Sequence, residues 1–130
     1  MPKKNKISGK GLQNYLESYQ LTRECIVDLI SKLRKRNRNL NNPPTPSEVA
    51  DNDEKILELV AAKALLDAKL AAFEANKVSI APPSDLQLNS LKDLIAKVDK
   101  LNTNQKISDE IVKLSTDVLT EFNNIHPDQA

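Results

Sequence analysis

The sequence predicts an all-α protein, an antiparallel four-helix bundle made of a long helical hairpin and a short helical hairpin. Apolar residues recur at helical spacings over four stretches, and no stretch shows the alternation that is typical of a strand. Proline and asparagine clusters separate the stretches, whereas the chain has only two glycines, Gly9 and Gly11. Proline therefore marks the ends of the helices.

The first predicted helix spans residues 11–39. Its apolar positions recur at intervals of three, four and seven residues, which places them on one face. The segment 41–46 should end this helix, because its three prolines remove hydrogen-bond donors and restrict the residues that precede them. The apolar face consists of Leu12, Leu16, Tyr19, Ile26, Ile30 and Leu33, widened by Val27 and Leu29.

The second predicted helix spans residues 47–77. Ser47 follows Pro46 and is the predicted N-cap, since a serine side chain can accept a hydrogen bond from the first turn. Alanine has high helix propensity and lets a neighbouring helix approach closely. The alanines of this helix are Ala61, Ala62, Ala64, Ala68, Ala71, Ala72 and Ala75.

The third and fourth predicted helices are shorter and span residues 85–102 and 105–125. Ser84 followed by Gln87 three residues later is the pattern of a capping box, which marks the start of the third helix. Each helix has apolar residues on one side only. These residues are Leu88, Leu91, Leu94, Ile95, Val98 and Leu101, then Ile107, Ile111, Leu114, Val118, Phe122 and Ile125.

The unequal helix lengths predict an uneven bundle. Helices of about 28 to 30 residues span about 42 to 45 Å, whereas about 18 residues span about 27 Å. We expect the third helix to begin beside the start of the first and to run back along the second, so that it stops about ten residues short of the tip of the long hairpin. A partner or a second copy would then cover the apolar residues at this tip, which are Leu29, Ile30, Leu33, Leu40, Val49, Ile56 and Leu57.

The domain organisation follows from the same pattern. Residues 1–10 are predicted to be a disordered basic arm, residues 11–126 a single helical domain and residues 127–130 a tail. Cys25 is the only cysteine, and a lone thiol suits the reducing cytoplasm. No apolar run reaches the roughly 18 residues that span a bilayer, so we expect no membrane partner.

The chain carries few residues that could form a catalytic or metal site. His126 is the only histidine, which disfavours histidine metal sites and Ser-His-Asp arrangements within one chain. Paired carboxylates, such as Glu54 with Glu58 or Glu17 with Glu24, are the remaining acid–base candidates, and such pairs usually lie on solvated helix faces. We therefore expect no catalytic residue, no cofactor, no metal and no small-molecule ligand.

A basic cluster at the end of the first helix is the main functional candidate. Residues 1–42 contain ten Lys and Arg against three acids, a net charge of +7, whereas residues 43–130 contain nine against fifteen, a net charge of −6. Such a cluster can bind phosphates or an acidic partner, and it can also simply complement the negative end of the helix dipole. It consists of Lys32, Arg34, Lys35, Arg36 and Arg38.

Two functions are consistent with these observations. The first is a non-enzymatic helical protein that acts through contact with another protein or through self-association. The second is a nucleic-acid-binding accessory protein that uses the arm 1–10 and the basic cluster 32–38, although no aromatic residue is interleaved with the cluster to stack on bases.

Overall fold

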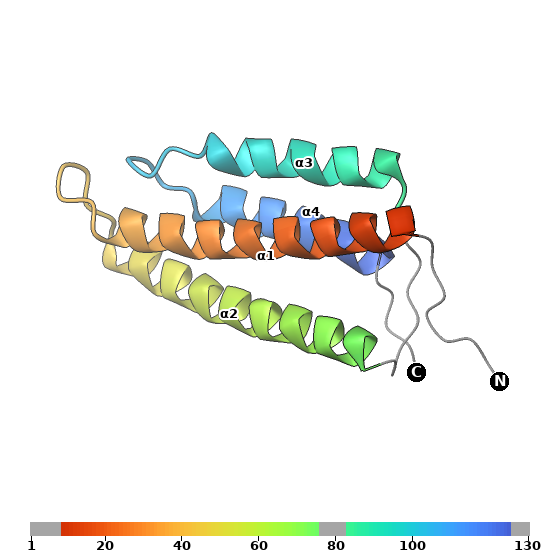
Figure 1. Ribbon diagram of the computed structural model, residues 1–130. Coiled ribbons are helices and arrows are strands. Elements are labelled where there is room, and N and C mark those ends of the chain that lie inside the picture. The colour runs from red at the N-terminus through yellow and green to blue at the C-terminus, as the bar shows by residue number, and fades with distance from the viewer. Residues whose placement is uncertain (1–8, 76–82, 126–130) are drawn as a thin grey trace.

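The computed structural model describes residues 9–75 and 83–125, and this part of the chain contains four helices and no strand (Figure 1). The predicted all-α bundle of a long and a short hairpin is confirmed. Most of the predicted arm 1–10 and the tail 127–130 lie outside the described residues. The helices are α1 (Gly9–Asn37), α2 (Pro46–Glu74), α3 (Asp85–Asp99) and α4 (Ser108–Ile125).

Helix α1 is the central element of the bundle. It packs against the other three helices, and α4 packs against α2 and α3 as well, whereas α2 and α3 do not touch each other. The helices within each hairpin are antiparallel, but α1 and α3 run in the same direction (Figure 1). The prediction that the third helix runs along the second is therefore wrong, because α3 lies along α1 instead.

Polar contacts fix the start of α3 beside the start of α1, as the sequence predicted. The amide of Asn14 donates hydrogen bonds to the Pro83 carbonyl at 3.1 Å and to Asp85 at 3.3 Å. Lys10 forms an exposed ion pair with the same carboxylate at 3.2 Å. Asn14 is itself buried, so this contact is shielded from competing water.

The buried face of α1 differs from the predicted one, chiefly over its first half. Ile26, Leu29, Ile30 and Leu33 are buried as predicted, but Leu12, Leu16 and Val27 are 39%, 40% and 43% exposed. Small or polar residues take the inward positions instead, and their size lets three helices pack closely around α1. The inward residues that the apolar pattern missed are Gly11, Asn14, Ser18, Thr22 and Arg36, and Tyr15 and Cys25 are buried beside them.

The helix ends are set by local hydrogen bonds. Thr45, and not the predicted Ser47, is the N-cap of α2, since its side chain accepts from the Glu48 N–H at 3.1 Å. Pro46 then occupies the first helical position, where its missing N–H and fixed φ cost nothing. The predicted capping box of Ser84 and Gln87 is confirmed, with both reciprocal hydrogen bonds present.

The loop between α3 and α4 reaches the tip of the long hairpin. The helices end and begin at Asp99 and Ser108 rather than at 102 and 105, which leaves the intervening loop free to extend. The Asn39 side chain donates to the Thr103 carbonyl at 3.3 Å and to the Asn104 side chain at 2.7 Å, and Asn42 donates to the Asn104 carbonyl.

The expectation of a poorly covered tip is therefore wrong for most of its residues. Leu29, Ile30, Leu33 and Ile56 are buried, because the neighbouring helices and the loop of the short hairpin close over them. Of the residues expected to need a cover, Leu40 and Leu57 remain exposed, at 92% and 71%.

Two leucines near the tip give a direct test of this core. We expect Leu29→Ala to lower the free energy of unfolding by about 2–5 kcal/mol, because it leaves a cavity at a fully buried position. Leu40→Ala removes the same atoms at an exposed position and should change stability by less than about 0.5 kcal/mol. Urea unfolding followed by circular dichroism measures both, and equal effects would contradict the burial of Leu29 and the exposure of Leu40.

Candidate interaction surface on the α1–α2 hairpin

The five residues of the predicted basic cluster do not act as one group. Arg34, Lys35 and Arg38 are exposed, and Lys32 is half-buried. Arg34 and Arg38 are four residues apart, so they share one face of α1. Arg36 turns the other way and is only 3% exposed.

Arg36 forms a buried ion pair across the hairpin with Glu48. Its Nε donates to one carboxylate oxygen at 2.6 Å and its Nη2 donates to the other at 3.1 Å, while Nη1 donates to the Asn42 carbonyl at 2.6 Å. The hydrogen bonds from Arg36 hold the pKa of Glu48 below its ordinary value of 4.5, although burial alone would raise it. This guanidinium is committed to the hairpin, which leaves Lys32, Arg34, Lys35 and Arg38 as the candidate partner-binding residues.

An asparagine layer lies next to this ion pair. Asn52 is fully buried and donates to the Asn37 side chain at 2.8 Å, and Asn37 donates in turn to Asp53 at 3.0 Å. The sequence pattern missed these polar residues because it counted only apolar ones. Their helical spacing could have identified them. Arg36 follows Leu33 by three residues and Asn52 precedes Ile56 by four, and these spacings place each polar residue on the same helix face as a buried apolar one.

A groove runs along the outer seam between α1 and α2. Its volume beside Val27, Ile30 and Ser31 is about 470 Å³, and an adjoining hollow of about 460 Å³ continues it toward Asp53. Its apolar lining consists of Val27, Ile30, Ile56, Leu57 and Val60. Arg34 and Arg38 line both parts, and Lys63 of α2 lines the first, so its border is mainly basic.

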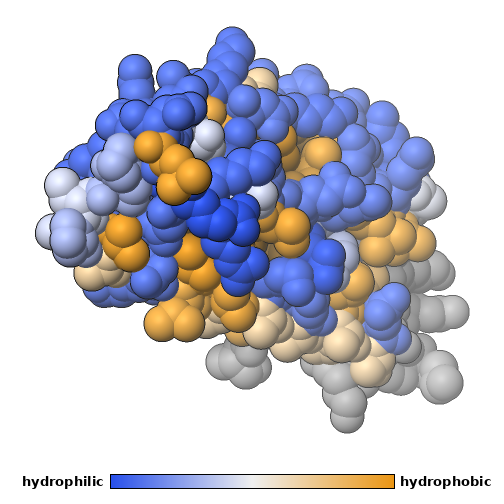
Figure 2. All heavy atoms as spheres, turned by 90° about the vertical axis from the view of Figure 1, so that its left-hand side faces the viewer, coloured by the Kyte–Doolittle hydropathy of each residue, from blue (hydrophilic) through white to orange (hydrophobic). Residues whose placement is uncertain are grey.

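The solvent-facing side of α2 next to this groove is apolar over most of its length. From residue 57 to residue 75, the only exposed side chains that are not apolar are Glu58 and Glu74. Figure 2 shows hydrophobic residues gathered along the lower side of the molecule, where α2 lies in Figure 1. The exposed apolar residues are Leu57, Val60, Ala61, Ala64, Leu65, Ala68, Ala71 and Ala75, and we call them the α2 face.

The α2 face is not a gap in the core. The opposite side of α2 buries Ile56, Leu59, Leu66 and Phe73 against the bundle. The ring of Phe73 packs 4.8 Å from that of Tyr15 on α1. A helix that is apolar on both sides needs two surfaces to cover it, and the described part of the chain supplies one.

A polar cluster joins α1 and α2 at the middle of the hairpin. Asp67 accepts a hydrogen bond from the Tyr19 hydroxyl at 2.6 Å and from Arg23 at 3.2 Å. The bond from Tyr19 is the largest cause that lowers the pKa of Asp67, so its carboxylate stays charged. This cluster is a second polar contact between α1 and α2.

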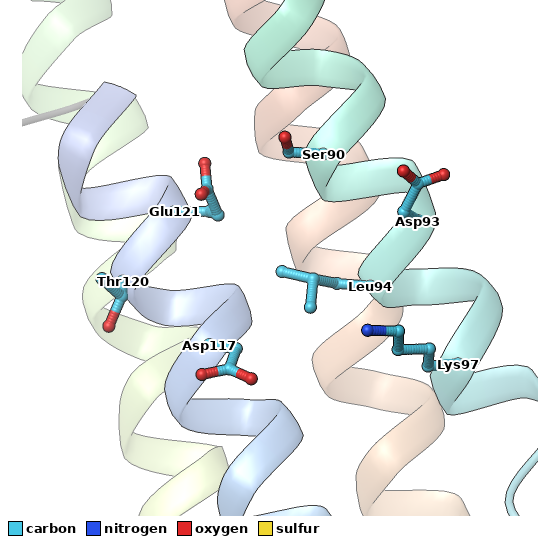
Figure 3. A pocket seen from close by; sticks show the side chains of 7 residues that line it. All are labelled: Ser90, Asp93, Leu94, Lys97, Asp117, Thr120 and Glu121. Atoms are coloured by element: carbon cyan, nitrogen blue, oxygen red, sulfur yellow. The ribbon is translucent and has the colours of Figure 1, made fainter.

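A second groove, of about 340 Å³, lies between α3 and α4 (Figure 3). Leu94 points into it, and Asp93 and Glu121 lie on opposite walls without converging on one point. Across the described residues, His, Cys, Asp and Glu side chains form no group of three that could hold a metal ion.

The other sequence candidates lie apart from these grooves. Glu58 pairs with Lys55 at 3.2 Å and Glu17 pairs with Lys92 at 3.0 Å, both at the surface. Cys25 is 2% exposed, and burial raises the pKa of its thiol to about 12, so it remains protonated and shielded at neutral pH. His126 lies outside the described residues.

Replacement of Glu48 tests the buried ion pair. We expect Glu48→Gln to lower the free energy of unfolding at pH 7 by about 3 kcal/mol or more, because a buried guanidinium loses its counter-charge. Glu58→Gln, which breaks an exposed pair, should cost less than about 1 kcal/mol.

The same variant has a defined pH dependence. The folded-state pKa of Glu48 lies below its ordinary value of 4.5, so the pair stabilises the fold fully above about pH 4.5 and is lost as pH falls through the folded-state pKa. The stability gap between the native chain and Glu48→Gln should therefore be constant from pH 7 to about pH 5 and narrow in more acidic buffer. Urea titrations at each pH measure the gap, and a gap that persists unchanged in acid would contradict this assignment.

Comparisons with known proteins give no further identification. The chain matches no protein-family model, and searches of curated proteins and of solved structures find no significant match. In the described part of the chain, no helix combines the length and hydropathy needed to cross a membrane.

Proposed function

We propose that this chain is a non-enzymatic helical-bundle protein that acts through protein–protein contact at the α2 face and the neighbouring groove. The supporting observation is the apolar side of α2 that no other described helix covers. Contiguous exposed apolar surface on a folded domain is typical of an interaction site, because its burial against a partner is favourable.

The geometry of the surface favours a helical partner. Leu57, Val60 and Leu65 protrude at one end of the α2 face, at 71%, 46% and 58% exposure, whereas the rest of it is alanine. The row of alanines lets the axis of a second helix approach closely, and the three protruding side chains set the position of that helix along α2. We also propose a cytoplasmic location, because the single buried thiol of Cys25 needs no oxidising compartment.

Charged substitutions on the α2 face test this function. We expect the double variant Ala61→Glu and Ala68→Glu to lose its partner, because association would bury unpaired carboxylates. Affinity capture from an extract of the producing cells, with mass spectrometry and a second, differently tagged copy of the chain present, detects both other proteins and self-association.

Ala96→Glu on α3 is the matched control. It makes the same exchange at an exposed alanine on another side of the bundle, and both residues are good helix formers. The proposal requires a partner that binds the native chain and the control but not the double variant. It is contradicted if no partner, including the second copy, depends on the α2 face.

A second candidate is a nucleic-acid-binding accessory protein. It is favoured by the groove beside Val27, which Arg34, Arg38 and Lys63 line without any acidic side chain. Phosphates would lie along this row, with Lys35 exposed nearby. In the predicted basic arm, Lys10 is already paired with Asp85.

Salt dependence tests this candidate. A single-stranded or duplex oligonucleotide should bind at low salt and lose affinity steeply as the salt concentration rises. In a plot of the logarithm of the binding constant against the logarithm of the salt concentration, each phosphate contact adds about 0.7–0.9 to the downward slope. Arg34→Ala, Lys35→Ala and Arg38→Ala together should abolish binding. The triple control Lys97→Ala, Lys100→Ala and Lys113→Ala, which removes as many cations from α3, α4 and their junction, should not. Absence of binding at low salt would end this candidate.

A further inference from the structure

We propose that the partner of the α2 face is a second copy of this chain, with the two α2 helices packed side by side and parallel across a two-fold axis. This inference rests on the proposed function and names the occupant of its surface. Three properties of the surface support it: its shape, its size and the distribution of charge on its two sides.

The shape of the α2 face suits packing against itself. Ala61, Ala64, Ala68 and Ala71 recur at intervals of three and four residues, so they form one line along the exposed side of α2. Two such lines facing each other let the helix axes approach to about 8 Å, the lower end of the usual range. No charged side chain lies on this line, so packing there buries no charge.

The outer side of the hairpin is large enough for a dimer interface. The 29 residues of α2 span about 43 Å, and α1 and α2 together are about 20 Å wide, so this side offers about 800 to 900 Å². Specific complexes bury roughly 800 Å² per partner, so the second copy would cover the outer side of α1 as well as the α2 face.

The charges on the two sides of the α2 face are complementary. On the α1 side, the exposed Arg34 and Arg38 line the groove next to Leu57. On the opposite side, Glu54 and Glu58 are exposed at the same level of the hairpin. Asp53 lies beside the two arginines and Lys55 pairs with Glu58, but the exposed ends of the two sides are of opposite charge. A two-fold interface must be self-complementary, and this pattern meets that condition.

This charge pattern selects the parallel arrangement. A two-fold axis along α2 places the basic side of each copy against the acidic side of the other, and both meet at the same height. An axis perpendicular to α2 makes the helices antiparallel and separates Arg34 and Arg38 from the acidic pair of the other copy by most of the length of the helix. Attraction between Arg34 and Arg38 of one copy and the acidic pair of the other then favours the parallel orientation of the two chains.

The mass in solution tests the partner. Sedimentation equilibrium of the full chain at micromolar concentration should give about 29 kDa, twice the 14.5 kDa of one chain. Ala61→Glu with Ala68→Glu should weaken the dimer by about 100-fold or more, whereas Ala96→Glu should not. Circular dichroism and urea unfolding confirm that all variants remain folded. A native chain that stays monomeric overturns the proposal.

Charge reversal tests the border. Arg34→Glu with Arg38→Glu should weaken the dimer, and the addition of Glu54→Arg and Glu58→Arg to the same chain should restore it, because both sides of each contact are then reversed. A fourfold variant that associates no better than the double variant overturns the parallel arrangement.

Engineered cysteines test the orientation directly. In a parallel dimer each residue of the α2 face lies next to the same residue of the other chain. Leu57→Cys and Ala71→Cys should therefore each form a disulfide-linked dimer under mild oxidation. The native chain is the control, because Cys25 is buried. In an antiparallel dimer neither variant would cross-link with itself, and only a mixture of the two variants would cross-link. That result would overturn the parallel arrangement.

These outcomes separate this inference from the proposed function. A chain that is monomeric but captures another protein through the α2 face contradicts the second copy and leaves the proposed function intact. A chain that neither dimerises nor captures a partner through this face contradicts both.

Discussion

The buried ion pair of Arg36 and Glu48 is the contact on which the rest of the structure depends. It joins the last turn of α1 to the first turn of α2, and through the Asn42 carbonyl it also orders the loop between them. That loop in turn binds the connection between α3 and α4 through Asn42 and Asn104. One guanidinium thus sets the register of the long hairpin and the position at which the short hairpin closes over it.

The register of α2 decides which of its sides is exposed. Because Arg36 meets Glu48, the residues at the same helical phase as Glu48, such as Asn52, Ile56 and Leu59, face the bundle. The opposite side, which holds the line of alanines, then faces solvent. A rotation of α2 about its axis would turn alanines toward the bundle in place of larger side chains such as Ile56 and Leu59, and it would separate Glu48 from Arg36. The ion pair and the apolar packing therefore favour the same orientation of this helix.

The sequence was sufficient to predict the helices but not how they pack. Four periodic stretches and the proline clusters predicted the helix count and the two hairpins, and the capping box at Ser84 was correct because its partners are three residues apart. The path of α3 and the cover of the tip depend on contacts between residues far apart in sequence, such as Asn14 with Pro83 and Asn39 with Asn104.

The exposure of Leu12 and Leu16 was not predicted because a hydrophobicity pattern always assigns leucine to the buried face. It does not consider that a serine or a glycine fits better where two helices lie close together. The sequence predicted where the basic cluster lies. It could not predict that Arg36 turns inward to pair with Glu48, which is twelve residues away.

The composition of the α2 face connects this fold to its proposed role. Alanine buries little apolar area per residue, so a face built from it is tolerated in water better than a row of leucines would be. Alanine also loses no side-chain entropy when it is covered, and close approach of two helices brings backbone atoms into contact as well. The affinity of such a surface then depends on how well a partner matches its shape and its border charges. An alanine line flanked by arginine on one side and glutamate on the other would select a partner by shape and charge more than by apolar attraction alone, as the proposed pairing with a second copy requires.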